Sequence, residues 1–214
     1  MMSVEPTLYG AAYSVYVRAA RLALEEKGVA YRLVPVDVFS EEGVPADHLE
    51  RQPFGRIPAF EYRGFRLYEA SAITRYVDEA FAGPPLQPRC PEDRARVNQV
   101  ISILDSYAYR SLVWDIYVER VSAPKRNRVP DEARIQAALP RAKICLTALE
   151  QIMGEGPFLT GAGLTLADLH AAPMFAYFEQ APEGRGLLES HDSVRAWWEM
   201  MATRASVMST VPVR

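Results

Sequence analysis

The 214-residue sequence predicts a small α/β unit followed by a larger all-helical domain. Three observations lead to this prediction. Strand and helix patterns alternate in the first part of the chain, a proline-rich stretch then interrupts it, and every later segment has the apolar spacing of a helix. The expected order β-α-β-α-β-β-α implies a sheet with both parallel and antiparallel strands, which is an α/β unit of thioredoxin type.

The elements of the first part follow from apolar periodicity and from glycine signals. Short apolar runs predict strands, and apolar residues at helical spacing after Ser14 predict the first helix. Gly28 follows Lys27 at the end of that helix, where glycine makes a left-handed turn easily. In chain order we expect a strand at 7–9, a helix at 14–27, a strand at 31–36, a short helix at 45–50, a hairpin of strands 57–62 and 65–68, and a helix at 71–81.

A domain boundary is expected at residues 82–91, because four prolines in ten residues cannot continue a helix or a central strand. We therefore divide the chain into a first domain at 1–82, a proline-rich linker at 83–91 and a helical domain at 92–214. The helical domain is expected to contain helices near 92–120, 131–153, 166–178 and 194–202, with loops at 154–163 and 181–186.

Composition argues against several classes of function. The formal net charge is −3 with acidic and basic residues interleaved, whereas a nucleic-acid surface needs clustered lysine and arginine. The start of the chain does not resemble a signal peptide, and no stretch approaches the roughly 20 apolar residues of a membrane span. Cys90 and Cys145 fit no metal or redox spacing, and three scattered histidines make no metal site. We expect a cytoplasmic, reduced protein that binds neither nucleic acid nor membrane.

Three segments in a fixed order carry a family resemblance. They are YGAAYSVYVR at residues 9–18, QPFGRIPAF at 52–60 followed by LYEASAI at 67–73, and FLTGAGLTLADL at 158–169. Together they resemble the cytosolic glutathione transferases, most closely the plant phi-type and similar bacterial members. The resemblance implies the glutathione transferase fold, glutathione as co-substrate without a metal, a small hydrophobic electrophile as second substrate, and a homodimer.

Ser14 is the candidate catalytic residue. Glutathione reacts as a thiolate, and a free thiol has a pKa of about 8.5, so an enzyme that uses it must lower that pKa. A hydroxyl that donates a hydrogen bond at the positive end of a helix favours the charged form. In phi-type relatives a serine four residues before the arginine of the first helix has this role, and Ser14 and Arg18 have that spacing. The alternatives are Tyr9 or Tyr13 as the activator, or a Ser14 that serves only as an N-cap.

Arg56, Ile57 and Pro58 resemble the cis-proline turn of the family. In that turn the backbone N–H and C=O of Ile57 would pair with the cysteinyl part of glutathione as one more strand. Without the flanking motifs, Pro58 would be interpreted as an ordinary proline at the start of a strand. Phe54, an apolar residue that follows Pro53 in an exposed turn, either inserts into a partner subunit, as in relatives, or covers its own domain.

Glu69, Ala70 and Ser71 are expected to bind the γ-glutamyl end of glutathione. The backbone N–H groups of Ala70 and Ser71 at a helix start would bind the carboxylate, and Glu69 would pair with the ammonium group. Relatives usually have a serine in place of Ala70, and a lost hydrogen bond to a charged group is worth about 1.5–3 kcal/mol, or roughly one to two powers of ten in affinity. The loop at 40–45 also lacks the His and Lys residues that phi-type relatives place near the glycyl carboxylate, a charge that Arg56 would partly replace.

Aromatic side chains are candidates for the electrophile pocket, although aromatics at helical spacing are more often part of a core. The candidates are Tyr13, Phe39, Tyr107, Trp114 and Tyr117, with Tyr109 and Phe178 in addition.

The remaining polar motifs are interpreted as structural. Thr165 and Asp168 have the spacing of a capping box that starts a buried helix. His170 is expected in the core, and His48 and His191 are expected in loops or on the surface.

The leading interpretation is a glutathione S-transferase that conjugates the glutathione thiolate to small apolar electrophiles, with a role in detoxification. Two alternatives stay open. One is a non-catalytic binding or assembly protein with the transferase fold, which Ala70 favours. The other is a glutathione-dependent isomerase or dehalogenase, because one fold hosts many chemistries.

Overall fold

The computed structural model describes residues 5–212, which group into two compact units. The first unit extends to Leu86 and also contains the segment from Ala205 onward, and the second unit extends from Gln87 to Arg204. The division falls inside the proline-rich stretch where we expected the linker. The grouping of the last segment with the first unit differs from the expected helical domain at 92–214.

The first unit is built on a four-stranded sheet with the order β2-β1-β3-β4. β1 pairs with β2 in parallel and with β3 in antiparallel orientation, and β3 and β4 form an antiparallel hairpin. Leu8 of β1 lies opposite Phe60 of β3, and both side chains are buried in the core. The strands are β1 (Thr7–Tyr9), β2 (Arg32–Val34), β3 (Ala59–Tyr62) and β4 (Phe65–Tyr68). The predicted mixed sheet and its hairpin are therefore confirmed.

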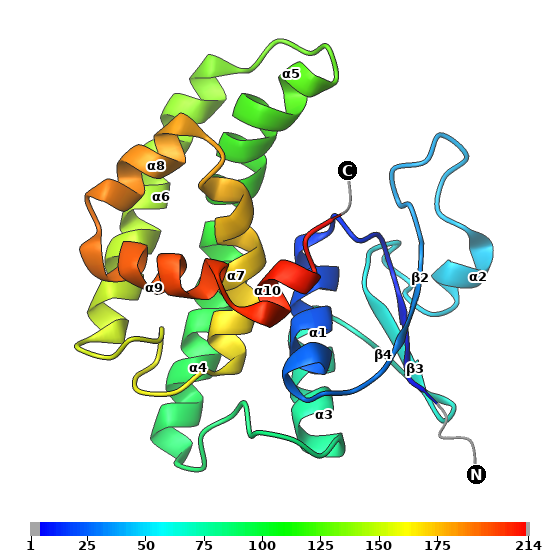
Figure 1. The fold of residues 1–214 in the computed structure, drawn as a ribbon. Helices are drawn as coiled ribbons and strands as arrows, with labels where there is room; N and C mark the ends of the chain where they lie inside the picture. The colour runs from blue at the N-terminus through cyan, green and yellow to red at the C-terminus, as the bar shows by residue number, and fades with distance from the viewer. Residues whose placement is uncertain (1–4, 213–214) are drawn as a thin grey trace. The chain divides into compact units, whose positions relative to one another are not determined.

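Helices α1 (Val15–Glu26) and α3 (Ala70–Ala80) pack side by side on one face of the sheet, and the short α2 (Ala46–Leu49) lies beyond the other face (Figure 1). α1 begins after its N-cap Ser14, whose side chain accepts a hydrogen bond from the Val17 N–H. It ends at Lys27, and Gly28 follows with a φ of 66°. The predicted start and end of this helix are thus confirmed.

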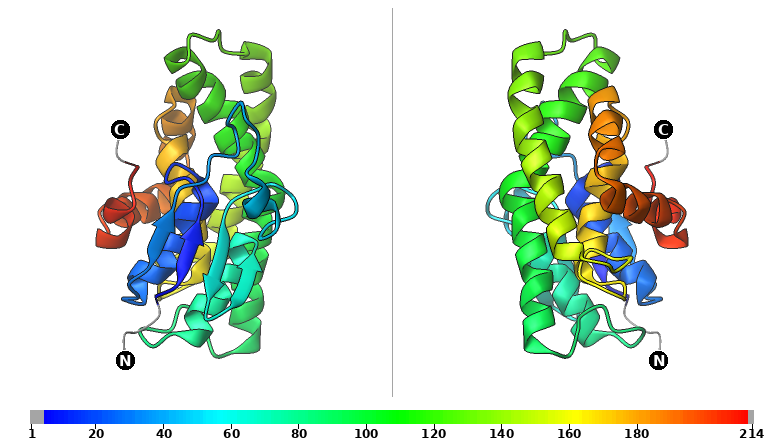
Figure 2. Two further views of the ribbon diagram at one scale, coloured as in Figure 1. Left: turned by 90° about the vertical axis from the view of Figure 1, so that its right-hand side faces the viewer. Right: turned by 90° about the vertical axis from the view of Figure 1, so that its left-hand side faces the viewer.

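The second unit is all helical. Two long helical segments, α4 with η1 and α6, run side by side in both views of Figure 2, and α7 packs against the first of them. η1 has the wider turn of a π-helix and continues α4 directly. The helices are α4 (Pro91–Ile103), η1 (Leu104–Ser122), α5 (Ala123–Lys125), α6 (Glu132–Met153), α7 (Leu166–Phe178), α8 (Pro182–Glu189) and α9 (Asp192–Ala202). None of the helices that the structure describes is long and apolar enough to cross a membrane.

The core of the second unit is organised by the start of α7. Asp168 accepts hydrogen bonds from the backbone N–H and the hydroxyl of Thr165, which confirms the predicted capping box. The same carboxylate accepts from the N–H of Leu159 and from the indole N–H of Trp197, so one buried acid ties the loop, α7 and α9 together. Burial raises the pKa of Asp168 above its ordinary value, and these four donors oppose that rise.

The prediction of a loop at 181–186 was wrong, because α8 begins at Pro182. Proline is well suited to the first position of a helix, where its missing N–H has no partner to lose. Gly184, which favoured a loop in the sequence, is required by packing. A Cβ atom there would lie 2.0 Å from the carbonyl oxygen of Phe178, so only glycine lets α8 pass this close to the end of α7.

The last segment packs against α1. Helix α10 (Ala205–Ser209) contacts α1 within the first unit. The buried guanidinium of Arg18 donates to the carbonyl of Val207 at 3.5 Å, and Arg21 donates to the carbonyl of Thr210 at 3.3 Å. Two arginines of α1 therefore hold the carbonyl groups at the C-terminal end of a short helix.

Candidate functional site in the first unit

Ser14 lies in the turn between β1 and α1, at the N-terminal end of the helix. Its Oγ accepts a long hydrogen bond of 3.4 Å from the Val17 N–H. Within residues 5–212, the Ser14 hydroxyl has no acceptor for its own proton. The hydroxyl is half-buried, so it remains able to donate to an anion placed at the positive end of α1. This geometry suits the role predicted for Ser14 and does not test it.

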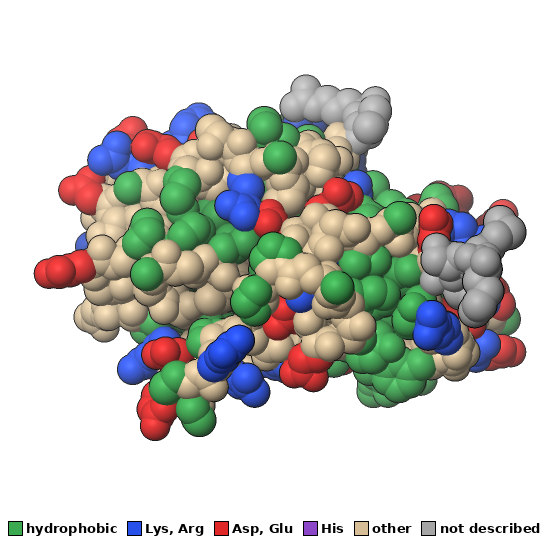
Figure 3. Space-filling model, turned by 60° about the horizontal axis from the view of Figure 1, so that its bottom comes forward, with side chains coloured by type: hydrophobic (Ala, Val, Ile, Leu, Met, Phe, Trp, Pro, Cys, Tyr) green, Lys and Arg blue, Asp and Glu red, His purple; other side chains and the backbone are tan. Residues whose placement is uncertain are grey.

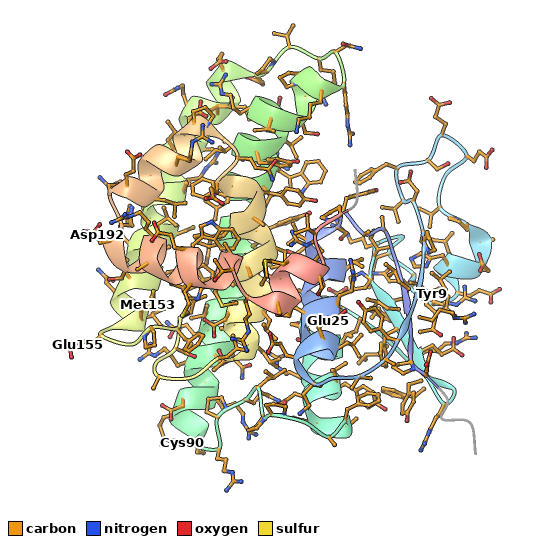
Figure 4. The ribbon with its side chains drawn as sticks, viewed as in Figure 1. Tyr9, Glu25, Cys90, Met153, Glu155 and Asp192 are labelled. Carbon is orange, nitrogen blue, oxygen red and sulfur yellow. The ribbon has the colours of Figure 1, made fainter. Side chains whose placement is uncertain are left out.

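The two tyrosine alternatives have other contacts. The Tyr13 hydroxyl donates to Asp37 Oδ1 at 3.1 Å. Tyr9, labelled in Figure 4, ends β1, and the guanidinium of Arg51 covers its ring at 4.5 Å from the centroid. Arg51 in turn pairs with Asp47 at 2.8 Å. Of the three candidate hydroxyl residues, Ser14 is the one at the helix N-terminus.

Gly10 brings the segment that leads to Ser14 against the turn that contains Ile57. A Cβ atom at Gly10 would lie 2.4 Å from Val17 Cγ2 and 3.2 Å from Ile57 Cβ. Its φ of 155° also favours glycine. β1 can therefore pass between α1 and this turn only with glycine at that position, and the two predicted binding segments become direct neighbours.

The peptide bond between Ile57 and Pro58 is cis, as the resemblance implied. In the part of the chain that the structure describes, neither the N–H nor the C=O of Ile57 has a backbone partner. β3 begins two residues later at Ala59, so within the described residues Ile57 presents an unpaired backbone N–H and C=O directly before this strand. An extended peptide with a free N–H and C=O can pair there by strand addition.

Glu69 and the first residues of α3 form the third part of the site. Glu69 is the N-cap of α3 and has a positive φ of 69°, which is unusual for a residue other than glycine. Its carbonyl accepts from Ala72 and Ile73, whereas the N–H groups of Ala70 and Ser71 have no backbone partner within the described residues. The side chain of Ala70 is buried and carries no hydroxyl. Two free N–H groups at a helix start can bind a carboxylate.

Two residues for which the sequence analysis predicted no binding role support the cis-proline turn, which we define as residues 56–58. His48 is 1% exposed, and its Nε2 lies 2.7 Å from the carbonyl oxygen of Arg56. Gln52 is equally buried, and its Oε1 accepts from the N–H groups of Phe54 and Arg56 at 2.7 and 3.3 Å. The position of Gln52 directly before Pro53 was the one sequence signal that could have indicated this role.

The prediction of a loop or surface position was wrong for His48, whereas His191 lies in the loop between α8 and α9 as predicted. His48 is buried in α2, and His191 is 3% exposed with its Nδ1 2.7 Å from the carbonyl oxygen of Leu187. His170 is a buried core residue as predicted, and its Nε2 pairs with Asp105 at 2.7 Å. Among the described residues no group of His, Cys, Asp and Glu is arranged to hold a metal ion.

The candidates for the electrophile pocket are distributed over both units and differ in exposure. Tyr13, Phe39 and Tyr107 are exposed at 40%, 62% and 66%, while Trp114 and Tyr117 are half-buried. Trp114 makes an edge contact with Tyr109, and Tyr117 stacks on Tyr177 at 4.4 Å. Phe178 is completely buried against Phe175, so this further candidate belongs to the core. The roles of the other candidates stay predictions.

A small cavity in the second unit is lined by none of these candidates. It has a volume of about 230 Å³ and is lined by the end of α6, the loop after it and α9, and its lining includes Met153 and Glu155, labelled in Figure 4. None of its lining residues is a predicted site residue.

Comparison with known proteins decides the family. A model of the glutathione S-transferase N-terminal domain matches residues 8–85, and a model of the C-terminal domain matches residues 132–199. A rice protein (Oryza sativa subsp. japonica) named probable glutathione S-transferase GSTF1 is 30% identical over 210 residues, which cover 96% of this chain and 95% of the rice protein. The chain belongs to the glutathione S-transferase family.

Solved structures agree with this assignment. Glutathione transferase F7 from Populus trichocarpa superposes with a TM-score of 0.84 and 29% identity, covering 96% of this chain and 97% of that one. Glutathione S-transferase I from maize, in complex with an atrazine glutathione conjugate, gives a TM-score of 0.83 and 27% identity over 96% of each chain. The N-terminal match of this family member contains Ser14, the cis-proline turn and the start of α3, and the C-terminal match contains the capping box.

Proposed function

We propose that this chain is an enzyme that conjugates the thiolate of glutathione to small apolar electrophiles. The observation that carries the proposal is the grouping, in one unit, of three places with unpaired donors or acceptors that match the parts of glutathione. In the proposed complex the Ser14 hydroxyl would face the thiol, the Ile57 backbone would pair with the cysteinyl amide, and the N–H groups of Ala70 and Ser71 would bind the γ-glutamyl carboxylate. Glu69 and Arg56, both exposed, add charges for the ammonium group and the glycyl carboxylate.

The chemistry requires a stabilised thiolate and a fixed orientation. Ser14 would donate its proton in a hydrogen bond to the sulfur, and the N-terminus of α1 would add positive potential, which together lower the thiol pKa. The thiolate then forms a bond to the electrophilic carbon, and the leaving group departs with the bonding electron pair. The rate gain comes from thiolate stabilisation and from orientation.

The finer parts of the proposal are the second substrate and the oligomer. Tyr13, Phe39, Tyr107, Trp114 and Tyr117 remain the candidates for electrophile contact. A homodimer is supported by Phe54, which is 69% exposed and makes an edge contact with Tyr68 at a centroid distance of 6.1 Å. Hydrophobic side chains also gather on the right-hand part of Figure 3. Dissociation of the protein on Phe54→Ser substitution, measured by analytical ultracentrifugation, would support insertion of Phe54 into a partner.

We also propose a cytoplasmic location and a role in detoxification.

The decisive experiment is conjugation of a chloronitrobenzene-type substrate, followed through product absorbance, together with retention on glutathione-agarose. A retained and active protein supports the proposal. The competing function is a non-catalytic binding or assembly protein, which the absence of a hydroxyl at Ala70 favours. It predicts no turnover, and no change in thermal stability at millimolar glutathione.

A further inference from the structure

We propose that His48 is a positioning residue for glutathione, which acts through the carbonyl of Arg56 on the backbone of Ile57. The inference rests on the proposed function, because it concerns the same cis-proline turn. It assigns a role in substrate binding to a residue of α2 that has no direct contact with the thiol site.

The hydrogen bond between His48 and Arg56 has a defined direction. A carbonyl oxygen can only accept, so His48 Nε2 carries the proton and donates over 2.7 Å. His48 Nδ1 is buried and has no hydrogen-bond partner within residues 5–212. The bond to Arg56 is thus the single polar contact that the described part of the chain gives to this ring.

The peptide groups on both sides of Arg56 are held from the same short segment. His48 binds the carbonyl of Arg56, and Gln52 Oε1 binds its N–H. His48 and Gln52 are themselves linked, since the Gln52 N–H donates to the His48 carbonyl at 2.9 Å. Two fully buried side chains therefore fix the orientation of the residue that directly precedes Ile57.

An apolar residue at position 48 would fill the space but would not hold the turn. The Arg56 carbonyl has no other protein donor within the described chain, so loss of His48 leaves it unpaired. The peptide that joins Arg56 to Ile57 would then be free to rotate, and the Ile57 N–H would lose its fixed direction. A misplacement of about 1 Å in a binding group can cost up to about 10²-fold in rate.

The test compares three variants of His48 with a matched control in the second unit. His48→Leu removes the donor. His48→Gln keeps an amide nitrogen at about the same distance from the backbone as Nε2. The shorter side chain of His48→Asn does not bring its amide nitrogen within hydrogen-bond distance of the Arg56 carbonyl. His191→Leu is the control, because His191 is also buried and also bonds a backbone carbonyl at 2.7 Å, that of Leu187. The measurements are KM for glutathione and kcat of the full-length protein, with thermal stability of each variant.

We expect KM for glutathione to rise about tenfold in His48→Leu and His48→Asn, with a smaller change in kcat, and to return close to the wild-type value in His48→Gln. His191→Leu should lose stability and keep its KM. If His48→Leu does not fold, the comparison of Asn with Gln carries the same test.

Two results would overturn the proposal. The first is a wild-type KM in the folded His48→Leu or His48→Asn variant. The second is an equal rise of KM in His191→Leu, which would indicate a general loss of stability. Absence of glutathione binding by the wild-type protein is a different outcome, because it would contradict the proposed function itself.

Discussion

The hydroxyl of Tyr13 donates a hydrogen bond to Asp37, whereas the hydroxyl of its neighbour Ser14 keeps its proton free of any acceptor in the described chain. A carboxylate competes with a thiolate for the same donor, so Tyr13 is the poorer activator. Ser14 also occupies the N-cap of α1, where the helix favours negative charge.

Ser14→Ala should therefore lower kcat/KM for conjugation by about one to two powers of ten, the worth of a hydrogen bond to a charged group. Tyr13→Phe should change it little. Steady-state kinetics with a chloronitrobenzene-type substrate measures both. Ser14→Ala also removes an N-cap, so Asp131→Ala is the control, since Asp131 caps α6 through the Arg134 N–H at 3.0 Å. Equal activity of Ser14→Ala and wild type would transfer the role to Tyr9 or Tyr13.

Ala70→Ser should strengthen glutathione binding. The new hydroxyl would stand beside the free N–H groups of Ala70 and Ser71, where relatives usually carry it, and would add a donor to the γ-glutamyl carboxylate. The Kd for glutathione, measured by isothermal titration calorimetry, is expected to fall about tenfold or more. Ser71→Ala is the matched change one position further on and should have a smaller effect. An unchanged Kd in Ala70→Ser would mean that another group already binds the carboxylate.

Removal of the Asp78 carboxylate should destabilise the first unit strongly. Lys27 Nζ lies 3.0 Å from Asp78 Oδ1, and both side chains are almost fully buried. Lys27 also donates to the carbonyl of Pro84, and Asp78 accepts from the Leu86 N–H, so the pair joins α1, α3 and the segment after α3. Breaking a buried pair by removal of one partner costs about 3–5 kcal/mol.

Urea denaturation of wild type and Asp78→Ala measures this loss in the free energy of unfolding. Asp192→Ala is the control, because its pair with Arg195 is exposed and worth only about 0–1 kcal/mol. Equal midpoints for the two variants would contradict the assignment of a structural role to the buried pair.

The ion pair of Arg120 with Glu132 and Glu183 predicts a pH dependence of stability. Hydrogen bonds from Arg120 at 2.6 and 2.7 Å hold the pKa of Glu132 below its ordinary value of 4.5. Because the pKa of Glu132 is lowered in the folded state, the ion pair stabilises the fold above pH 4.5. This stabilisation is lost as the pH falls through the pKa of Glu132 in the folded protein. The difference in Tm between wild type and Glu132→Gln should therefore be largest near neutral pH and should shrink in acid. A difference in Tm that stays constant from neutral to acidic pH would contradict this role of the ion pair.

Local signals predicted most of the fold. The N-cap at Ser14, the turn at Arg63 and Gly64, and the capping box of Thr165 and Asp168 are encoded in a few neighbouring residues, and the structure confirms the elements that they start or end. Contacts distant in sequence were not predictable in this way. The last segment binds Arg18 through Val207, a residue 189 positions away, and nothing in the local pattern of that segment indicates it.

The residues that we propose to bind glutathione have local sequence signals, whereas the residues that support them do not. Ser14, Ile57 and Glu69 stand in recognisable motifs. His48 does not, because its role depends on the approach of α2 to Arg56, and a histidine four residues before Gln52 has no local signature. The prediction of a loop at 181–186 was wrong for the same reason, since the need for glycine at Gly184 comes from Phe178 in another helix.

The most direct test of the account is a titration of the glutathione thiol in the binary complex, followed by the ultraviolet absorbance of the thiolate, for wild type and Ser14→Ala. A free thiol has a pKa of about 8.5. The account predicts that the wild-type complex titrates clearly below that value and that Ser14→Ala returns the pKa close to it. A bound thiol with the pKa of free glutathione in the wild-type complex, or an unchanged low pKa in Ser14→Ala, would contradict the central claim.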